Sequence, residues 1–497
     1  MRKYIASLTL LAVASSSAMA TDYYWRYVSG WWGNWSNNFQ TEGGSFGNPG
    51  ADDNIIFNGY DYYGVAGTSQ ASLVVGEKTV NDMIFEKAYV DDADNAGSTK
   101  GLWISVNGSE AASNVDHPTT LFNIKGSLYF KNSVNSGSVQ IGATASKTHS
   151  LMNIEIGTVG GDSNTGNIYL SGAGNYNATL NLGASNSAYG GLNSLLVHNN
   201  VYFDTGQLNM NAERTDTVSS IDNPDVDIKG VFYYNTSGSW GLAMRSNSTD
   251  AYVRLGGLQT VSGGNKVSNS AASASVGNTY LVFNNAADTS YSYWGWMREY
   301  NNNRNLNLIM AGAGEQTVYE TSTGDGLSQF MRGEVFVKNG TFQMGTAGGE
   351  VSKVSIEGGR FSAYGASSNI GELKIANLDW KSGSLLVNFD DYGENCDLLI
   401  VSGSFNKLGD AGQKYLVELD LSLALVGESY KIVSWADGTT DFVATDFISN
   451  EREGIGATFE IVNNELWATI TQVPEPATFA GILGAMALGI VVYRRRK

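Results

Sequence analysis

Short runs of apolar residues recur from about residue 70 to residue 330, and none of them keeps the apolar period of about 3.6 residues that marks an amphipathic helix. Gly, Asn, Ser and Asp separate the runs, which is typical of strands joined by turns. The clearest runs are 121–124, 128–130, 154–156, 168–170, 180–182, 195–197 and 252–255. The pattern predicts an all-β chain of many short strands.

One segment departs from this rhythm. Residues 291–305 are rich in Trp, Tyr and Asn. We interpret them as a longer, projecting loop.

From residue 335 a repeat becomes countable: a large apolar residue, two others, Gly, one more, and a second apolar residue. Four copies follow in succession, with Gly340, Gly359, Gly383 and Gly403 lying 19, 24 and 20 residues apart. A period of about twenty residues with one glycine turn fits a coil of a parallel β-helix. Each coil exposes an apolar face that only its neighbours cover. We therefore expect a right-handed parallel β-helix, or solenoid, over residues 71–395.

A solenoid needs a cap at each end, and both flanking segments suit that role. Residues 21–70 are rich in tryptophan, which fits either an aromatic N-terminal cap or a platform on which sugar rings stack. These tryptophans are Trp25, Trp31, Trp32 and Trp35. Residues 396–472 carry longer apolar strands and predict an antiparallel C-terminal β cap. Those strands are expected at 398–401, 415–425, 430–435 and 466–470.

The N-terminus has the form of a secretory signal peptide over residues 1–20. Arg2 and Lys3 form a positive region, a mostly apolar stretch follows, and Ala18 and Ala20 supply small residues at the −3 and −1 positions. We expect signal peptidase to cleave before Thr21.

The last segment, 473–497, has three parts in succession. They are a motif of Val473, Pro474, Glu475 and Pro476, an uncharged run at 477–493, and a basic end of Arg494, Arg495, Arg496 and Lys497. As a helix the run would be about 25 Å long, close to the roughly 30 Å of a bilayer core. Because basic residues beside an apolar run stay in the cytoplasm, the run predicts a C-terminal transmembrane helix with the preceding chain outside. The prolines predict an extended, accessible segment just outside the membrane.

This tail resembles the PEP-CTERM sorting signal, a family of bacterial C-terminal signals that membrane proteases called exosortases recognise. Motif, span and basic cluster occur in that family's order and at the very end of the chain. The resemblance implies export and inner-membrane handling by an exosortase. It also implies delivery to the surface, outer envelope or extracellular matrix of a Gram-negative-type bacterium, commonly alongside exopolysaccharide production. An ordinary single-span tail anchor is the alternative.

The opening segment also resembles passengers built from autotransporter-associated β-strand repeats. There a Trp-rich "NW" segment leads to a strand of the GxxDxxxF type, matched here by Gly50, Asp53 and Phe57. Autotransporters end in a membrane β-barrel whereas this sequence ends in RRRK, so we do not expect self-translocation.

Composition and charge narrow the classes of partner. The chain has 60 Gly, 5 Pro and a net charge of −18; the signal peptide contributes +2 and the tail +3, so the exported part carries −23. That charge argues against nucleic acid and anionic lipid, which bind basic surfaces, and suits divalent cations. The single cysteine, Cys396, excludes an intramolecular disulfide and leaves burial or an interchain pair.

No catalytic motif is recognisable. The three histidines, His117, His149 and His198, lie in unlike contexts without metal-ligand spacing, and we find neither a nucleophile elbow nor a phosphate-binding loop. We therefore expect no enzymatic activity and no cofactor other than calcium.

Acidic clusters are the remaining candidates for chemistry. Calcium takes roughly six to eight oxygen ligands, and closely spaced carboxylates on turns supply several of them. The candidate ligands are Asp222, Asp225, Asp227, Asp390, Asp391 and Glu394, with Asp397 beside the second group and a further group at Asp91, Asp92 and Asp94. In some β-helix lyases such a calcium acts with a nearby basic residue on acidic polysaccharide, and Lys229 follows the first group here. The alternative is that Asp populates turns for backbone reasons.

These observations favour an exported cell-envelope or matrix protein with a structural or adhesive role, linked to exopolysaccharide or biofilm. The expected partners are signal peptidase and exosortase during processing, the membrane before processing, and extracellular polysaccharide. The alternatives are a carbohydrate-active β-helix enzyme, either a polysaccharide lyase or a glycoside hydrolase, and a polysaccharide-binding module. A binding module of this kind needs Trp31, Trp32 or Trp294 exposed and coplanar.

Overall fold

The structure of the protein is a computed structural model. It describes residues 20–25, 33–34, 39–58, 70–75, 78–86, 89–91, 99–106, 119–131, 137–143, 151–171, 178–182, 192–204, 206–212, 219–235, 241–246, 250–261, 265–269, 277–299, 304–320, 332–346, 350–365, 370–436, 440–473 and 476–495.

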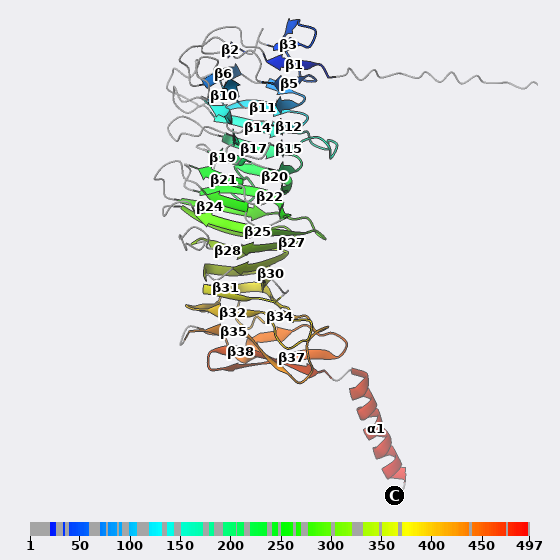
Figure 1. Ribbon diagram of the computed structural model, residues 1–497. Helices are drawn as coiled ribbons and strands as arrows, with labels where there is room; N and C mark the ends of the chain where they lie inside the picture. The colour runs from blue at the N-terminus through cyan, green and yellow to red at the C-terminus, as the bar shows by residue number, and fades with distance from the viewer. Residues whose placement is uncertain are drawn as a thin grey trace, which may run out of the picture.

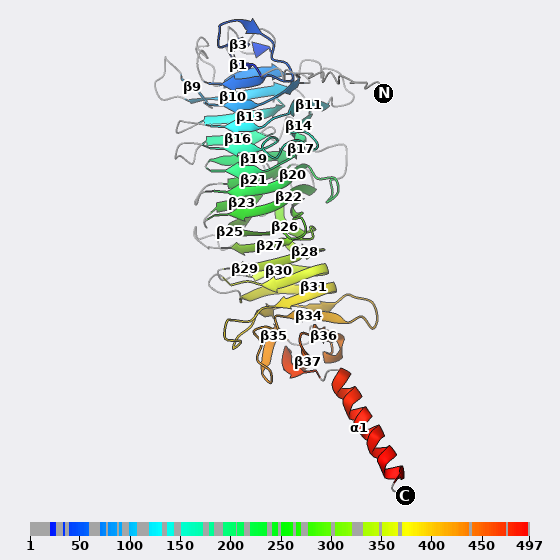
Figure 2. The same ribbon diagram turned by 90° about the vertical axis from the view of Figure 1, so that its right-hand side faces the viewer.

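The described strands form a β-solenoid of about ten turns, in which strands of one coil pair in parallel with the equivalent strands of the next. Chain order follows the long axis of the stack from β1 to β38, so coils that are neighbours in sequence are neighbours in space (Figures 1 and 2). The all-β solenoid prediction is confirmed, and the hand of the coil stays a prediction.

From β1 to β25 the strands lie in three parallel columns. The first column holds β2 (Gly33–Asn34), β6 (Gln70–Val75), β10 (Thr99–Val106), β13 (Gly137–Ala143), β16 (Ala178–Leu182), β19 (Gln207–Ala212), β21 (Gly241–Ser246), β23 (Asn265–Asn269) and the second half of β25 (Ser290–Glu299). The short strand β9 (Tyr89–Asp91) pairs antiparallel with β10.

The second column continues almost to the C-terminal end. It holds β7 (Lys78–Val80), β11 (Thr119–Ile124), β14 (Leu151–Ile156), β17 (Leu192–Val197), the first halves of β20 (Val226–Tyr234) and β22 (Asp250–Thr260), β24 (Gly277–Phe283), β26 (Arg304–Met310), β28 (Glu334–Val337), the first halves of β30 (Glu350–Ala363) and β31 (Glu372–Val387), β32 (Leu398–Val401) and β35 (Ser429–Trp435).

The third column holds β1 (Asp22–Trp25), β5 (Asn54–Phe57), β8 (Met83–Phe85), β12 (Leu128–Phe130), β15 (Ile168–Leu170), β18 (Val201–Phe203) and the second halves of β20 and β22. Beyond them the first half of β25 begins a run of β27 (Glu315–Glu320), β29 (Thr341–Thr346), the second halves of β30 and β31, β34 (Tyr415–Leu419) and β36 (Phe447–Ser449). The strand β33 (Phe405–Lys407) pairs with the middle of β31.

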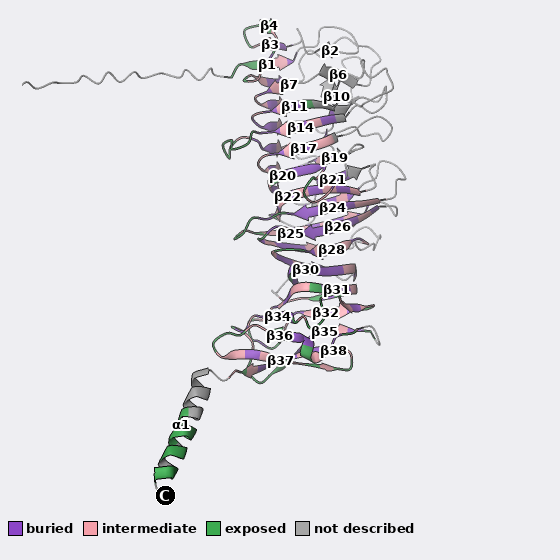
Figure 3. Ribbon diagram, turned by 180° about the vertical axis from the view of Figure 1, so that it is seen from behind, coloured by how far each residue is buried: buried purple, intermediate pink, exposed green. Residues whose placement is uncertain are grey.

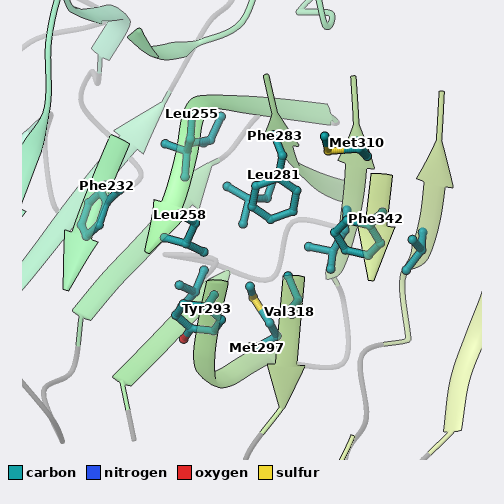
Figure 4. Packing of buried hydrophobic residues seen from close by; sticks show 14 of the residues in the cluster. Phe232, Leu255, Leu258, Leu281, Phe283, Tyr293, Met297, Met310, Val318 and Phe342 are labelled. Atoms are coloured by element: carbon teal, nitrogen blue, oxygen red, sulfur yellow. The ribbon is translucent and has the colours of Figure 1, made fainter. Parts of the chain in front are cut away.

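Inward and outward positions alternate along the strands because successive side chains point to opposite faces. In β12, β15 and β18 the two outer residues are buried and the central residue is half-buried. The inward side chains form one hydrophobic cluster along the stack, where Phe232, Leu258, Leu281 and Phe283 point into the same interior (Figure 4). Purple, buried positions therefore run the length of the solenoid in Figure 3.

The described residues of the predicted loop 291–305 form strands. Residues Ser290–Glu299 form β25, and β26 begins at Arg304. Tyr293 and Met297 point inward and are buried, while Trp294 and Trp296 are half-buried on the other face. The loop prediction was wrong because the abundance of Trp and Tyr, which favours strands, outweighs the turn preference of Asn.

The coil length is also less regular than the glycine repeat suggested. The sequence offset between paired residues is 19 for Val335 and Val354 but 45 for Met83 and Leu128. Turns between columns therefore vary widely in length while the strand pairing is kept.

Three of the four repeat glycines meet at one corner of the coil. A Cβ atom on Gly383 would lie 2.2 Å from the carbonyl oxygen of Gly359, and a Cβ atom on Gly359 would lie 2.6 Å from that of Asn339. Gly340, one coil earlier, approaches the backbone of Gly314 in the same way. Gly403 instead lies against Ala376, at a different corner, so the fourth copy of the repeat does not stack on the third.

The ends of the solenoid are closed differently. At the N-terminal end β3 (Phe39–Thr41) and β4 (Phe46–Gly47) form antiparallel pairs beside β1, and Trp25 is fully buried with its ring 5.6 Å from that of Phe57. At the C-terminal end parallel pairing continues as far as β36, preceded by a 3-10 turn at Ala444–Asp446. Antiparallel pairing then joins β35, β38 (Glu465–Gln472) and β37 (Ile455–Val462).

The helix α1 (Pro476–Arg495) extends beyond the C-terminal end of the solenoid (Figures 1 and 2). Pro476 occupies its first position, where the missing N–H of proline costs no helical hydrogen bond. Among the helices that the structure describes, none has the length and apolar character required to cross a membrane. The transmembrane role expected of 477–493 stays a prediction. Residues 1–19 of the expected signal peptide, which was predicted over 1–20, lie outside the described residues, as do Pro474, Glu475, Arg496 and Lys497.

The corner contact predicts that glycine at position 383 is needed for more than its backbone angle. Gly383 and Gly412 both have φ of +82°, but a Cβ on Gly412 meets nothing within 4 Å. We expect Gly412→Ala to cost about 1–2 kcal/mol for the left-handed backbone. Gly383→Ala should cost clearly more, because two coils must separate locally. Thermal unfolding of both variants measures the difference, and equal losses would contradict direct coil-to-coil contact at this corner.

Candidate functional site

One corner of the solenoid carries a ladder of hydrogen bonds from backbone to side chain. In each step a side-chain oxygen accepts the backbone N–H of the equivalent corner residue one coil later. The acceptor and donor pairs are Asn54 Oδ1 and Asp82 N (3.2 Å), Asp82 Oδ1 and Ser127 N (2.7 Å), Ser127 Oγ and Asn167 N (3.2 Å), Asn167 Oδ1 and Asn200 N (2.9 Å), and Asn200 Oδ1 and Val231 N (2.8 Å). This corner ladder gives a partner to amides that lie where one column ends and the next begins.

Four tyrosines stack on the outer face of the third column, two residues after the corner ladder. They are Tyr129, Tyr169, Tyr202 and Tyr233. Successive ring centroids are 4.9, 5.1 and 5.3 Å apart, with interplanar angles of 6°, 8° and 7°. The spacing follows the roughly 4.8 Å between paired strands. All four side chains are half-buried, so this tyrosine ladder is a regular feature of the outer surface.

The tyrosine hydroxyls lie next to the corner ladder. Asn200 Nδ2 donates to Tyr202 Oη at 3.1 Å, and Ser127 and Asn167 stand in the same relation to Tyr129 and Tyr169. Because neighbouring rings cover one another's faces, the ladder presents ring edges and hydroxyls to solvent. Burial is the main cause that raises the pKa of Tyr129 and Tyr169, so both hydroxyls keep their protons at neutral pH.

The sequence holds a signal for both ladders that the period analysis missed. A tetrapeptide of one polar corner residue, an apolar residue, Ile or Tyr, and a large apolar residue recurs six times, with a departure at the first position of the last copy. The copies are NIIF at 54–57, DMIF at 82–85, SLYF at 127–130, NIYL at 167–170, NVYF at 200–203 and VFYY at 231–234. Their uneven spacing hides them from any analysis that assumes a fixed period.

The first acidic cluster is held by donors from this chain. Arg254 binds Asp227 through Nε at 2.9 Å and Nη2 at 2.6 Å, and Lys229 Nζ lies 2.5 Å from Asp227 Oδ2. Burial raises the pKa of Asp227, but the hydrogen bonds from Arg254 and Lys229 outweigh it and hold the pKa below its usual value. Asp227 is therefore an ion-pair partner on the second column.

The other two residues of that cluster, Asp222 and Asp225, lie in environments that differ from that of Asp227. Asp225 is fully buried and accepts hydrogen bonds from Ser219 Oγ at 2.7 Å and from the backbone N–H of Tyr252 at 2.8 Å. Asp222, in contrast, is exposed. Asp225 thus ties a turn to the next coil.

The second acidic cluster forms a tight turn. Asp390 accepts the backbone N–H of Glu394 at 2.8 Å and Asn395 Nδ2 at 2.7 Å, while Asp391 and Glu394 are exposed. Among the side chains that the structure describes, no three of His, Cys, Asp and Glu form a group that could hold a metal ion. Calcium binding stays a prediction. The side chains of Asp91, Asp92 and Asp94 lie outside the part of the chain that the structure describes.

Asp397, beside that turn, is the hub of a buried network. Its carboxylate accepts the backbone N–H groups of Gly371 and Asn388, Asn388 Nδ2, and Ser362 Oγ, at 2.8–2.9 Å. These partners come from two successive coils, at the end of β30 and at the two ends of β31, and Asp397 itself precedes β32 of the next coil. Burial raises the pKa of Asp397 to about 6, although the hydrogen bonds from Asn388, Gly371 and Ser362 oppose the shift.

Trp294, one of the tryptophans named for a binding module, is covered by neighbours. Tyr319 lies 5.2 Å from Trp294 at an angle of 35°, and Tyr364 lies 5.9 Å from it edge-on, so the half-buried Trp294 is part of a closed aromatic cluster. His198 Nε2 lies 2.8 Å from Glu155 Oε1. The tryptophans Trp31, Trp32 and Trp35 lie outside the described residues, as do His117 and His149.

Cys396 is half-buried and its Sγ donates to the carbonyl oxygens of Asp397 and Lys431. Burial raises the pKa of its thiol to about 12, so the thiolate is scarce at neutral pH. In the segment that resembles autotransporter repeats, Gly50 N donates to Asp53 Oδ2 at 2.8 Å, and the Phe57 ring stacks on Phe85 at 4.8 Å. That motif therefore forms a turn followed by a core strand.

No protein-family model matches the chain. No curated protein matches it either. Among solved structures, the chain is similar to the crystal structure of the Haemophilus influenzae Hap adhesin, with 9% identity and a TM-score of 0.22 over 86% of this chain and 66% of that one. The chain thus spans slightly less than two thirds of that protein's chain. At this TM-score the similarity carries no inference about function.

The buried position of Asp397 predicts a pH-dependent stability. Its folded pKa of about 6 lies above the ordinary 3.8, so the folded state binds the proton more tightly. The stabilising contribution is full below pH 3.8 and is lost as the pH rises through about 6. We expect Asp397 to cost the fold up to about 3 kcal/mol between pH 4 and pH 7.

Urea unfolding at a series of pH values measures this effect. The Asp397→Asn variant should lose that part of the pH dependence, whereas Asp391→Asn, which removes an exposed carboxylate, should keep the wild-type profile. A profile of Asp397→Asn identical to that of the wild type would contradict the assignment.

Proposed function

We propose that this protein is an exported, elongated surface protein with a structural or adhesive role at the bacterial cell envelope. The observation that carries the proposal is the continuous solenoid, which ends in a cap and then in a separate apolar helix. Such a rod places a long, repetitive flank at a distance from its attachment point. Its role then depends on length and on surface contacts along that flank.

The internal pairing of polar groups along the flank supports a structural role. Asp227 is engaged by Arg254 and Lys229, and Asp379 and Glu334 by Lys353. Lys229 and Asp227 lie on the same strand, β20, whereas the other ion pairs join neighbouring coils because their members lie on adjacent strands. They fit a rod whose outward charges stabilise the stack.

The tail supports attachment at one end. The exposed fraction of the apolar side chains on α1 is 52–67% for Met486, Leu488, Ile490, Val491 and Tyr493. Apolar side chains exposed together on one element favour a covering partner, and we propose the inner membrane before processing. Val473 N donates to the carbonyl oxygen of Gly454 at 2.6 Å, which fixes the start of the tail to the C-terminal cap.

Within this proposal, signal peptidase cleaves after Ala20, and an exosortase recognises Pro474, Glu475 and Pro476. The basic residues Arg494 to Lys497 hold the tail on the cytoplasmic side. Release then delivers the rod to the outer surface or the extracellular matrix, where exopolysaccharide is the expected neighbour. These roles rest on the resemblance of the tail to PEP-CTERM signals.

A polysaccharide-binding role is the second candidate, because the tyrosine ladder offers a regular row of hydroxyls on the outer face. It differs from an enzymatic role in requiring retention of the polysaccharide without cleavage. Incubating the purified full chain with polysaccharides, and scoring retention and product release together, separates the two. We expect no product release; turnover of any polysaccharide would favour the lyase or hydrolase alternative.

The export proposal predicts that surface display depends on the tail motif. In intact cells that carry the matching protease, we expect added proteinase to digest the wild-type chain and mass spectrometry to find Thr21 as its first residue. A variant with Pro474→Ala, Glu475→Ala and Pro476→Ala should instead stay with the inner membrane, because the protease loses its recognition site.

The control is Asp391→Asn, an exposed change in the solenoid that should be displayed like the wild type. Recovery of the wild-type chain from the cytosol with residues 1–20 still attached would overturn the proposal.

A further inference from the structure

We propose that the tyrosine ladder binds a neutral, extended, β-linked polysaccharide that lies parallel to the solenoid axis. The inference deepens the proposed surface role by naming the partner class and the residues that contact it. It rests on that proposed function for its setting, while its test is independent of export.

The repeat distance of the ladder carries the argument. Tyr129, Tyr169, Tyr202 and Tyr233 present equivalent atoms every 4.9–5.3 Å along one line. In an extended β-1,4-linked glycan each pyranose unit advances by a closely similar distance, and because successive units are flipped, each edge of the flat ribbon presents the two sides of the pyranose ring in alternation. A ribbon laid along the ladder therefore meets one tyrosine per sugar unit.

The chemistry of the ladder suits hydroxyl groups more than a single stacked ring. The neighbouring tyrosines cover one another's ring faces, and Lys131 Nζ lies 5.2 Å from the centroid of the Tyr129 ring at one end. A sugar therefore has little ring face on which to stack. Tyr202 Oη already accepts a hydrogen bond from Asn200 Nδ2, so the hydroxyl proton of Tyr202 can be donated to a sugar. The raised pKa of Tyr129, Tyr169 and Tyr233 keeps these hydroxyls as donors.

Charge favours a neutral polymer over an anionic one. The whole chain carries −18, and Asp82 lies close enough to Tyr129 and Tyr169 to raise the pKa of both, with burial as the larger cause. A polyuronate would bring like charges toward this face and lose affinity. An α-linked glucan curves into a helix, so its hydroxyls do not stay in line with the ladder.

Cumulative contacts also predict a dependence on chain length. Each tyrosine contributes one weak hydrogen bond, and affinity should increase as neighbouring sugar units of one chain bind together. Cellobiose, which can meet two of the four tyrosines, should bind much more weakly than cellohexaose, which can meet all four.

The test is isothermal titration calorimetry on the purified full chain. The probes are cellohexaose, cellobiose, maltohexaose and polygalacturonate. We expect binding of cellohexaose, weaker binding of cellobiose, and little heat from the α-linked or anionic probes. Absence of cellohexaose binding, or equal binding of all four probes, would overturn the proposal.

A matched pair of variants locates the site. The triple variant Tyr169→Phe, Tyr202→Phe and Tyr233→Phe keeps the stacked rings and removes three hydroxyls. The control Tyr252→Phe with Tyr280→Phe alters another stacked pair, 4.4 Å apart on the second column. We expect the triple variant to lose about tenfold or more in cellohexaose affinity, because it removes three hydroxyl groups that each contribute a hydrogen bond. The control should bind like the wild type.

Thermal unfolding of the triple variant checks that it is folded. Unchanged cellohexaose affinity in a folded triple variant would place the binding elsewhere and refute the assignment. Proteinase accessibility on intact cells reports the surface role separately, so a displayed protein without glycan binding would overturn this inference and leave the proposed function standing.

Discussion

Parallel pairing between successive coils is the constraint on which the rest of the structure depends. A single coil cannot cover its own apolar face, so its interior side chains are buried only by the coils above and below. The pairing places equivalent residues in register, and like therefore meets like along the stack. Phe57 on Phe85 in the core and Gly359 beneath Gly383 at a corner are two results of the same constraint.

The same register that fills the core also shapes the outer surface. Whatever side chain faces outward in one coil has a counterpart about 4.8 Å away in the next. Polar corner residues consequently form the corner ladder, which satisfies backbone amides, and outward tyrosines form the tyrosine ladder beside it. Charged side chains form ion pairs between coils, as Arg254 does with Asp227. A repetitive surface is thus a consequence of the fold, and it suits a repetitive ligand.

The sequence predicted the strands well because their inward residues alternate locally, and all seven apolar runs named from 121–124 to 252–255 fall within strands. Coil length was less predictable, because turns between columns lie outside the packed interior and tolerate insertions of many residues. The glycine repeat correctly predicted the stacked glycines from Gly340 to Gly383. It was wrong for Gly403, which lies at a different corner, and only the stacking partner of Gly403 in the structure shows this. The tyrosine ladder was missed because its copies are unevenly spaced and become a single feature only when the coils stack.

The most direct test of this account is a structure of the full chain determined with cellohexaose, because it depends on the coil register and on the surface that the register creates. The account predicts a glycan running parallel to the solenoid axis, with successive sugar units against Tyr129, Tyr169, Tyr202 and Tyr233. A glycan bound across the axis, or on a face that lacks these tyrosines, would contradict it.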